Sequence, residues 1–281
     1  AKDAIVYALK TMGSMRFTFN CVLTRENVSI PAVRDFIQKK LNKAHQGFDN
    51  PGVDQRELQV TTEELMLPYD DSGMNHSLQT TDEKKEILHT LFEETIDDKN
   101  QFSWTVYQKV RSFYESLVYG RPAEAVGQKC GMDREDNIAI DMKGNVTTCQ
   151  NTSSLTKHNI GSIEDFDNIR LDTSYHWTTR KECPSCPVVQ LCQGACLFLE
   201  DKYWEQACEN LFWYNLAMLS AALFKMTDGL VLTEIRSDRI RFDGVTSIPV
   251  IDIEYMKTGV KTWKVRKPIN IPVVQVPVEP R

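Results

Sequence analysis

The chain has 281 residues, enough to bury a hydrophobic core in one large domain or two smaller ones without disulfide bonds. Its 33 Lys and Arg residues are outnumbered by 39 Asp and Glu residues, so no global positive field attracts nucleic acid or anionic lipid. The most apolar stretch, residues 211–224, contains Asn215 and is followed by Lys225, which predicts a buried helix rather than a membrane span. The first residues lack the pattern of a secretory signal. We therefore expect a cytoplasmic protein with neither nucleic acid nor membrane as a partner.

The first part of the chain alternates between strand and helix patterns. Residues 16–23, RFTFNCVL, are rich in β-branched and aromatic residues and predict a strand, and residues 30–41 predict a helix with Pro31 in its first turn. A second strand is predicted at 57–61, then a loop through LPYDDSG. Helices are predicted at 81–96, capped by Thr81, and at 102–117. This alternation is typical of α/β units with parallel strands, and we place a domain boundary near residue 122.

The pattern changes from Cys130 onward. Residues 137–149, NIAIDMKGNVTTC, alternate around a turn at 142–145 and predict a β-hairpin. Cysteine-rich loops follow, and then a helix at about 204–226. From residue 240 the chain is β-branched and proline-rich, which predicts extended segments. His89 falls within the predicted helix 81–96, where we expect it at the surface.

Seven of the eight cysteines lie between residues 130 and 208 and need an explanation. Cys183 and Cys186 are separated by two residues, a spacing that lets two thiolates face one metal centre. Zinc sites use the same spacing, but one tetrahedral zinc would take four thiolates and leave three, or a second zinc would need His158 or His176. Disulfides are the least favoured alternative because no secretory signal is present. A zinc-stabilised interaction module and a stand-alone electron-transfer iron–sulfur protein stay open as alternatives.

The complete cysteine spacing resembles a known family signature. The seven cysteines and Gly144 follow the pattern Cys130-x13-Gly144-x4-Cys149, then Cys183-x2-Cys186-x5-Cys192-x3-Cys196, and finally Cys208. This pattern resembles the seven-cysteine signature of the SPASM domain, which is found at the C-terminus of radical S-adenosylmethionine enzymes. Residues 158–166, HNIGSIEDF, are similar to the family's stretch between the second and third cysteines. Residues 1–120 are similar, with weaker motifs, to the last strands and helices of the family's partial (β/α) barrel.

The resemblance implies two auxiliary four-iron four-sulfur clusters. The outer cluster would be held by Cys183, Cys186, Cys192 and Cys208. The inner cluster would be held by Cys130, Cys149 and Cys196. Two such clusters need eight thiolates, so the inner cluster would take a further ligand or keep one iron open. We expect the eighth cysteine, Cys21, to be a small buried side chain on the first predicted strand.

The resemblance also implies a domain organisation. The fold class would be α/β, with the C-terminal half of a partial β/α barrel followed by a small irregular α+β iron–sulfur domain. The barrel part would span residues 1–122, the SPASM domain 123–228, and an extended C-terminal segment 229–281.

The activity implied by the resemblance belongs to a longer protein. That protein would be an oxidoreductase that modifies a peptide or protein, for example by forming a cross-link, with S-adenosylmethionine, a third cluster and a reductant such as flavodoxin or ferredoxin. The present chain has no Cys-x-x-x-Cys-x-x-Cys motif, so we expect a C-terminal fragment that does not cleave S-adenosylmethionine by itself. Gln150 stands where relatives that oxidise sulfatases carry a proton-accepting Asp, which disfavours that reaction. No catalytic residue is assigned.

Two further features have both a functional and a purely structural interpretation. Residues 255–270 are basic, contain Trp263, and could bind an acidic leader peptide or form a solvated strand face. An aromatic group could shield the outer cluster from water or simply fill the core. Its members are Trp204, Phe212, Trp213 and Tyr214.

Overall fold

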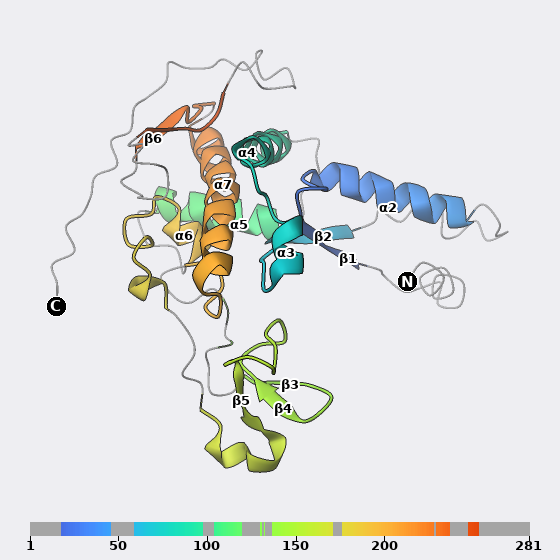
Figure 1. The fold of residues 1–281 in the computed structure, drawn as a ribbon. Coiled ribbons are helices and arrows are strands. Elements are labelled where there is room, and N and C mark those ends of the chain that lie inside the picture. Colours follow the sequence, from blue (N-terminus) through green and yellow to red (C-terminus); the bar gives the residue numbers. More distant parts are fainter. Residues whose placement is uncertain are drawn as a thin grey trace.

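The computed structural model of the chain describes residues 18–45, 59–97, 104–119, 130, 132, 137–170, 176–227, 229–236 and 247–252. It combines helices with short strands, as predicted (Figure 1). The parallel sheet in these residues contains two strands, β1 and β2, and a barrel is not shown. No helix in the described residues is long and apolar enough to cross a membrane.

The predicted strand–helix–strand unit is present. Strand β1 (Thr18–Leu23) pairs in parallel with β2 (Gln59–Leu65), and α2 (Ile30–His45) lies between them in the sequence. Strand β2 continues four residues beyond its predicted end at Thr61. Ser29 caps α2, because its Oγ accepts a hydrogen bond from the Ala32 N–H at 3.2 Å.

Three local predictions are corrected by the structure. A short helix, α3 (Asp71–His76), replaces the predicted loop, because the Asp70 carboxylate accepts from the Gly73 N–H at 2.7 Å and caps it. Helix α4 (Thr81–Ile96) has the predicted bounds, but its cap is Thr80, which forms a capping box with Glu83. His89 is buried rather than exposed.

The burial of His89 has a specific cause. Its Nδ1 lies 2.7 Å from the Lys85 carbonyl oxygen, one helical turn earlier. Its Nε2 accepts the backbone N–H of Asp252 at 2.9 Å. The histidine therefore joins α4 to the extended segment that follows β7 (Ser247–Pro249), a contact between residues far apart in the sequence.

Helix α7 (Asp201–Met226) is the centre of the molecule (Figure 1). It begins three residues before its predicted start, and α4 and α5 (Trp104–Val118) pack against it. From Leu211 to Ala222 every side chain is buried, including Asn215 and Ser220, whose side chains hydrogen-bond to carbonyls one turn earlier. A single hydrophobic core contains residues from α4, α5 and α7, on both sides of the boundary predicted near residue 122.

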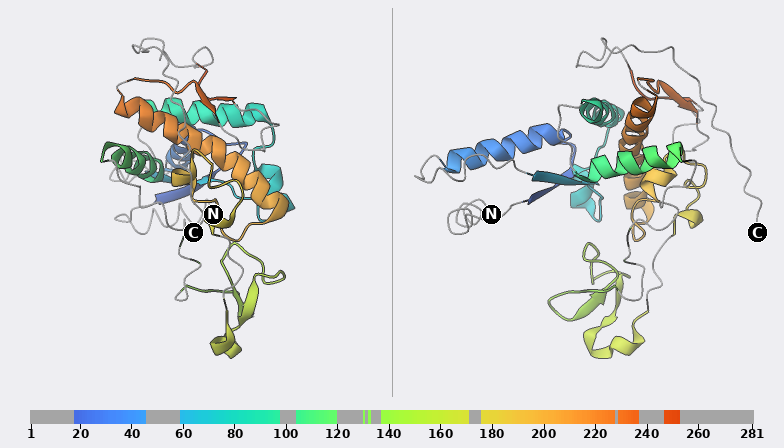
Figure 2. Two further views of the ribbon diagram at one scale, coloured as in Figure 1. Left: turned by 90° about the vertical axis from the view of Figure 1, so that its left-hand side faces the viewer. Right: turned by 180° about the vertical axis from the view of Figure 1, so that it is seen from behind.

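A small antiparallel lobe projects from the helical body in every view (Figures 1 and 2). It contains the predicted hairpin of β3 (Ala139–Ile140) and β4 (Asn145–Thr147), to which β5 (Asn159–Ser162) adds a third strand. Gly144 closes the hairpin turn with a φ of 83°. A 3₁₀ helix, η3 (Ile163–Asn168), follows β5.

The remaining elements lie around α7. They are η4 (Trp177–Thr179), α6 (Val189–Cys192) and the antiparallel pair β6 (Glu234–Arg236) and β7. The β6–β7 pair lies near the C-terminal end of the helix (Figure 1). The prediction of extended structure from residue 240 holds at 247–252, and the rest of that stretch, including the basic residues 255–270, lies outside the described residues.

Candidate metal centre

The described residues include all eight cysteines, and every one of them is a free thiol. No disulfide bond joins any of them in the structure. The seven cysteines of the signature separate into two groups in space, which we call the outer set and the inner set. The outer set is Cys183, Cys186, Cys192 and Cys208. The inner set is Cys130, Cys149 and Cys196.

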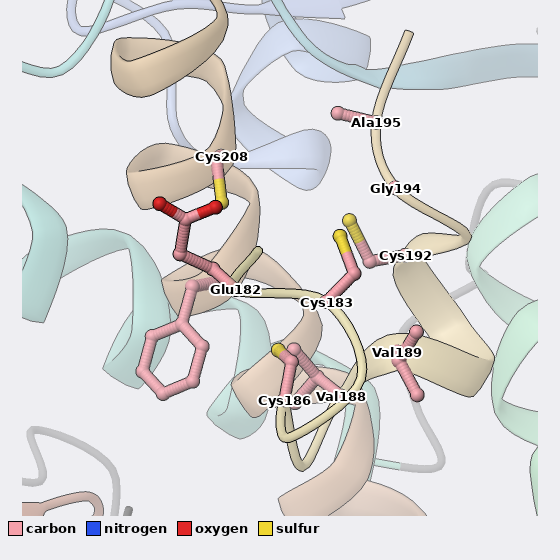
Figure 3. A pocket seen from close by; sticks show the side chains of 10 residues that line it. Glu182, Cys183, Cys186, Val188, Val189, Cys192, Gly194, Ala195 and Cys208 are labelled. Carbon is pink, nitrogen blue, oxygen red and sulfur yellow. The ribbon is translucent and has the colours of Figure 1, made fainter. Parts of the chain in front are cut away.

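The outer set lines one pocket (Figure 3). Cys208 comes from the second turn of α7, Cys192 from the last residue of α6, and Cys183 and Cys186 from the loop before α6. The Cys186 N–H donates to the Cys183 carbonyl at 3.0 Å, which folds the two-residue spacer into a turn. The other residues of the pocket wall are mostly apolar, and one of them, Glu182, carries a carboxylate. They are Glu182, Val188, Val189, Gly194, Ala195 and Phe212.

The pKa of Cys183 reflects its burial and the presence of the other three outer thiols nearby. Burial raises the pKa of Cys183 to about 12, and the charges of Cys208, Cys192 and Cys186 add to this effect, while Arg180 opposes it. Four ionised thiols would repel one another in this apolar wall. A bound cationic centre would remove that repulsion and release the thiol protons.

The loop between Cys192 and Cys196 directs these two thiols to different sets. Gln193, Gly194 and Ala195 all have left-handed backbone conformations, with φ values of 53°, 76° and 63°. Left-handed conformations are unfavourable for residues with a Cβ, so Gln193 and Ala195 must be held by the surrounding structure. This segment connects a cysteine of the outer set to one of the inner set.

Gly194 is required by packing as well as by its backbone conformation. A Cβ at this position would lie 2.5 Å from the Cβ of Trp177 in η4. We expect Gly194→Ala to lower the free energy of unfolding by more than the 1–3 kcal/mol or so that a strained backbone costs, because Trp177 must also move. Chemical denaturation of the variant and the unchanged protein measures this difference.

Gly144→Ala is the matched control for Gly194→Ala. Gly144 has a similar φ of 83°, but its added Cβ would meet only an Ile163 methyl group at 3.2 Å. The control should therefore show the backbone cost alone. Equal losses of stability in the two variants would contradict the packing argument.

The inner set joins the lobe to the loop before α7. Cys149 follows β4, Cys196 follows the left-handed loop, and both are buried, whereas Cys130 is exposed. Burial is the main cause that raises the pKa of Cys149, and the charges of Cys196 and Cys130 raise it further. The three thiols therefore lie within electrostatic reach of one another. The Asn151 N–H donates to the Cys149 Sγ at 3.4 Å, as is typical of ligand thiolates.

A tyrosine that the sequence analysis did not identify also reaches the inner set. The Tyr69 hydroxyl donates to the Cys196 Sγ at 3.3 Å. The pKa of Tyr69 is raised, mainly by burial and then by the charge of Cys196. Tyr69 lies 127 positions before Cys196 in the sequence, so no local pattern could indicate this contact.

Arg180 lies between the two sets and was also not identified from the sequence. Its guanidinium donates to the carbonyl oxygens of Cys196 at 3.3 Å and Leu199 at 2.8 Å. It lies 4.4 Å from the ring centroid of Trp204, within the range of a cation–π interaction. This buried positive charge also lowers the pKa of Cys183, so Arg180 contacts the backbone of one inner cysteine and acts on the charge of one outer cysteine.

No family model, curated protein or solved structure matches the chain.

Other sequence-predicted candidates lie apart from the two sets or have other contacts. Cys21 is on β1 as predicted, is half-buried, and accepts a hydrogen bond from Asn27 at 3.4 Å. His158 packs edge-on against the ring of Phe198, and His176 caps η4 by accepting the Thr178 N–H. Within the described residues, no group of three or more His, Cys, Asp or Glu side chains is arranged to hold a metal ion.

The aromatic group has two kinds of environment. Phe212 lines the outer pocket, where it excludes water from the thiols. Tyr214 is fully buried in the core that α7 forms with α4 and α5, so packing accounts for it.

Proposed function

We propose that the chain binds two four-iron four-sulfur clusters and forms the auxiliary-cluster part of a radical S-adenosylmethionine enzyme that modifies a peptide or protein. The observation that carries the proposal is the division of the seven thiols into an outer and an inner set. The members of each set are those that the SPASM resemblance assigns to one cluster. The spacing pattern and the spatial grouping therefore support the same ligand assignment.

The arrangement favours clusters over zinc. Tetrahedral zinc with Zn–S bonds of about 2.3 Å needs its four sulfurs about 3.8 Å apart. A four-iron cluster binds each thiolate through a different iron, so its four sulfurs are spread more widely around it. The outer pocket offers four thiols and the inner set three, more than one tetrahedral zinc would use. A zinc-stabilised interaction module is accordingly the weaker alternative.

The protein's own groups would bind and shield the clusters. When bound, the clusters supply one-electron redox chemistry. The outer thiols would hold theirs against α7, where Phe212 and two valines exclude water. The inner thiols would hold theirs between the lobe and the body. Arg180 would offset part of the negative charge of both.

The finer parts of the proposal concern the fold and the partners. The β1–α2–β2 unit would belong to a partial β/α barrel, and S-adenosylmethionine would bind to a third cluster in the full-length protein. A peptide or protein is the proposed substrate, flavodoxin or ferredoxin the proposed reductant, and the reducing cytoplasm the proposed compartment. A stand-alone electron-transfer protein would have the same two clusters but no Cys-x-x-x-Cys-x-x-Cys motif in the full-length sequence.

Metal analysis tests the proposal. After anaerobic reconstitution we expect about eight irons and eight sulfides per chain, since two cubane clusters follow from the two sets of thiols. The Cys21→Ala variant is the control, because Cys21 has its own partner in Asn27 and should leave both counts unchanged. Stoichiometric zinc without sulfide would refute the cluster assignment, and iron loss in the control would make Cys21 a ligand.

A further inference from the structure

We propose that Tyr69 is a hydrogen-bond donor to the Cys196 thiolate and thereby raises the reduction potential of the inner cluster. This inference rests on the proposed function, because it assumes that Cys196 is a cluster ligand. It assigns a role to a residue that lies outside the cysteine pattern, on the other side of the predicted domain boundary. Tyr69 is thus a positioning and tuning residue rather than a ligand.

The position of Tyr69 is fixed by the turn that carries it. The turn runs from the end of β2 to the start of α3, with Pro68 buried on one side and Asp70 capping α3 on the other. The Tyr69 ring packs against the hydrophobic cluster that contains Cys149, Cys196 and Trp204. The turn and the packing of the ring already fix the Tyr69 side chain. Its hydroxyl therefore loses little further conformational entropy when it donates to the Cys196 sulfur.

Both buried inner thiols receive a hydrogen bond. The Tyr69 hydroxyl donates to the Cys196 Sγ at 3.3 Å, and the Asn151 N–H donates to the Cys149 Sγ at 3.4 Å. Of these two donors, only the Tyr69 hydroxyl belongs to a side chain, so a substitution can remove it without changing the backbone.

The geometry distinguishes a donor from a ligand. If Tyr69 were a ligand, its oxygen would bind the fourth iron, and Cys196 would bind a different iron. The Tyr69 oxygen would then lie as far from the Cys196 sulfur as the other ligand sulfurs do. The observed 3.3 Å is a hydrogen-bond distance to sulfur. Reduction adds negative charge to the cluster and its thiolates, so a donor to a thiolate stabilises the reduced form and raises the potential.

The test compares two tyrosine variants of the reconstituted chain by redox titration monitored with electron paramagnetic resonance. Tyr69→Phe removes only the hydroxyl and should lower the midpoint potential of one cluster while iron and sulfide content stay unchanged. Tyr203→Phe is the matched control. The Tyr203 hydroxyl donates to the exposed Asp71 at 3.1 Å, so its loss should shift neither potential.

A second background assigns the shift to the inner cluster. In the Cys208→Ala variant only the inner cluster should be present, and the Tyr69→Phe shift should persist there.

Each outcome decides the proposal. An unchanged inner potential in Tyr69→Phe would overturn it. Loss of iron from the inner site in Tyr69→Phe would also overturn it, by making Tyr69 a ligand. Failure of the proposed function gives a different result, because the parent chain would then lack iron and sulfide altogether.

Discussion

Replacing Cys208 with Ala should remove the outer cluster and reduce the iron content from about eight to about four per chain. Cys208 supplies the only outer thiol on α7, whereas the other three come from the loop and α6 on the opposite side of the pocket. Without the Cys208 thiol, one iron of the outer cluster would face a methyl group in a mostly apolar wall, whereas the inner set includes the exposed Cys130 and leaves its fourth iron open to a further ligand. The inner set shares no thiol with this pocket, so its cluster should stay.

Iron and sulfide analysis, together with the spin count of the reduced protein, measures this effect. Circular dichroism checks that α7 remains helical in the variant. Cys21→Ala serves again as the cysteine control and should retain about eight irons. Loss of both clusters from a folded Cys208→Ala protein would contradict the division into two independent sets.

Replacing Lys109 with Met should destabilise the helical body by about 3–5 kcal/mol, because it leaves a buried carboxylate without its cation. The Lys109 ammonium pairs with Glu64 on β2, where the two side chains are only 15% and 11% exposed. It also donates to the Asn215 Oδ1 on α7 at 3.0 Å. The pair therefore joins β2, α5 and α7 in the interior. Denaturant unfolding of both proteins measures the loss.

Lys202→Met is the matched control for Lys109→Met. Lys202 pairs with Asp71 at 2.6 Å, but these side chains are 59% and 77% exposed. Water and salt screen such a pair, so its loss should change stability much less than the loss of the buried pair does. Similar effects of the two substitutions would contradict the distinction between the buried and the exposed pair.

The sequence predicted elements whose periodicity is strong and local. Helix 81–96 was predicted to the residue, and the hairpin around Gly144 follows from alternation and a turn signal. Adjacent threonines made the cap ambiguous, since only backbone geometry shows that Thr80 rather than Thr81 accepts from Glu83. His89 could not be predicted as buried, because the residue that covers it, Asp252, is 163 positions away.

The resemblance to the SPASM signature implies two sets of thiols, and the structure groups the same cysteines. The surrounding groups could not be predicted, because they come from separate segments. The Tyr69 hydroxyl donates to the Cys196 sulfur from the turn after β2. The Arg180 guanidinium donates to the Cys196 carbonyl oxygen from the segment before Cys183. Gly194 stands within the pattern as an unremarked spacer, and only the neighbouring Trp177 explains why that position needs glycine.

A crystal structure of the reconstituted chain, with anomalous diffraction recorded on both sides of the iron absorption edge, tests the central claim most directly. The account predicts two separate iron peaks. One should be enclosed by Cys183, Cys186, Cys192 and Cys208, and the other should be bound by Cys130, Cys149 and Cys196. A single iron peak, ligands exchanged between the two sets, or anomalous signal only at the zinc edge would contradict it.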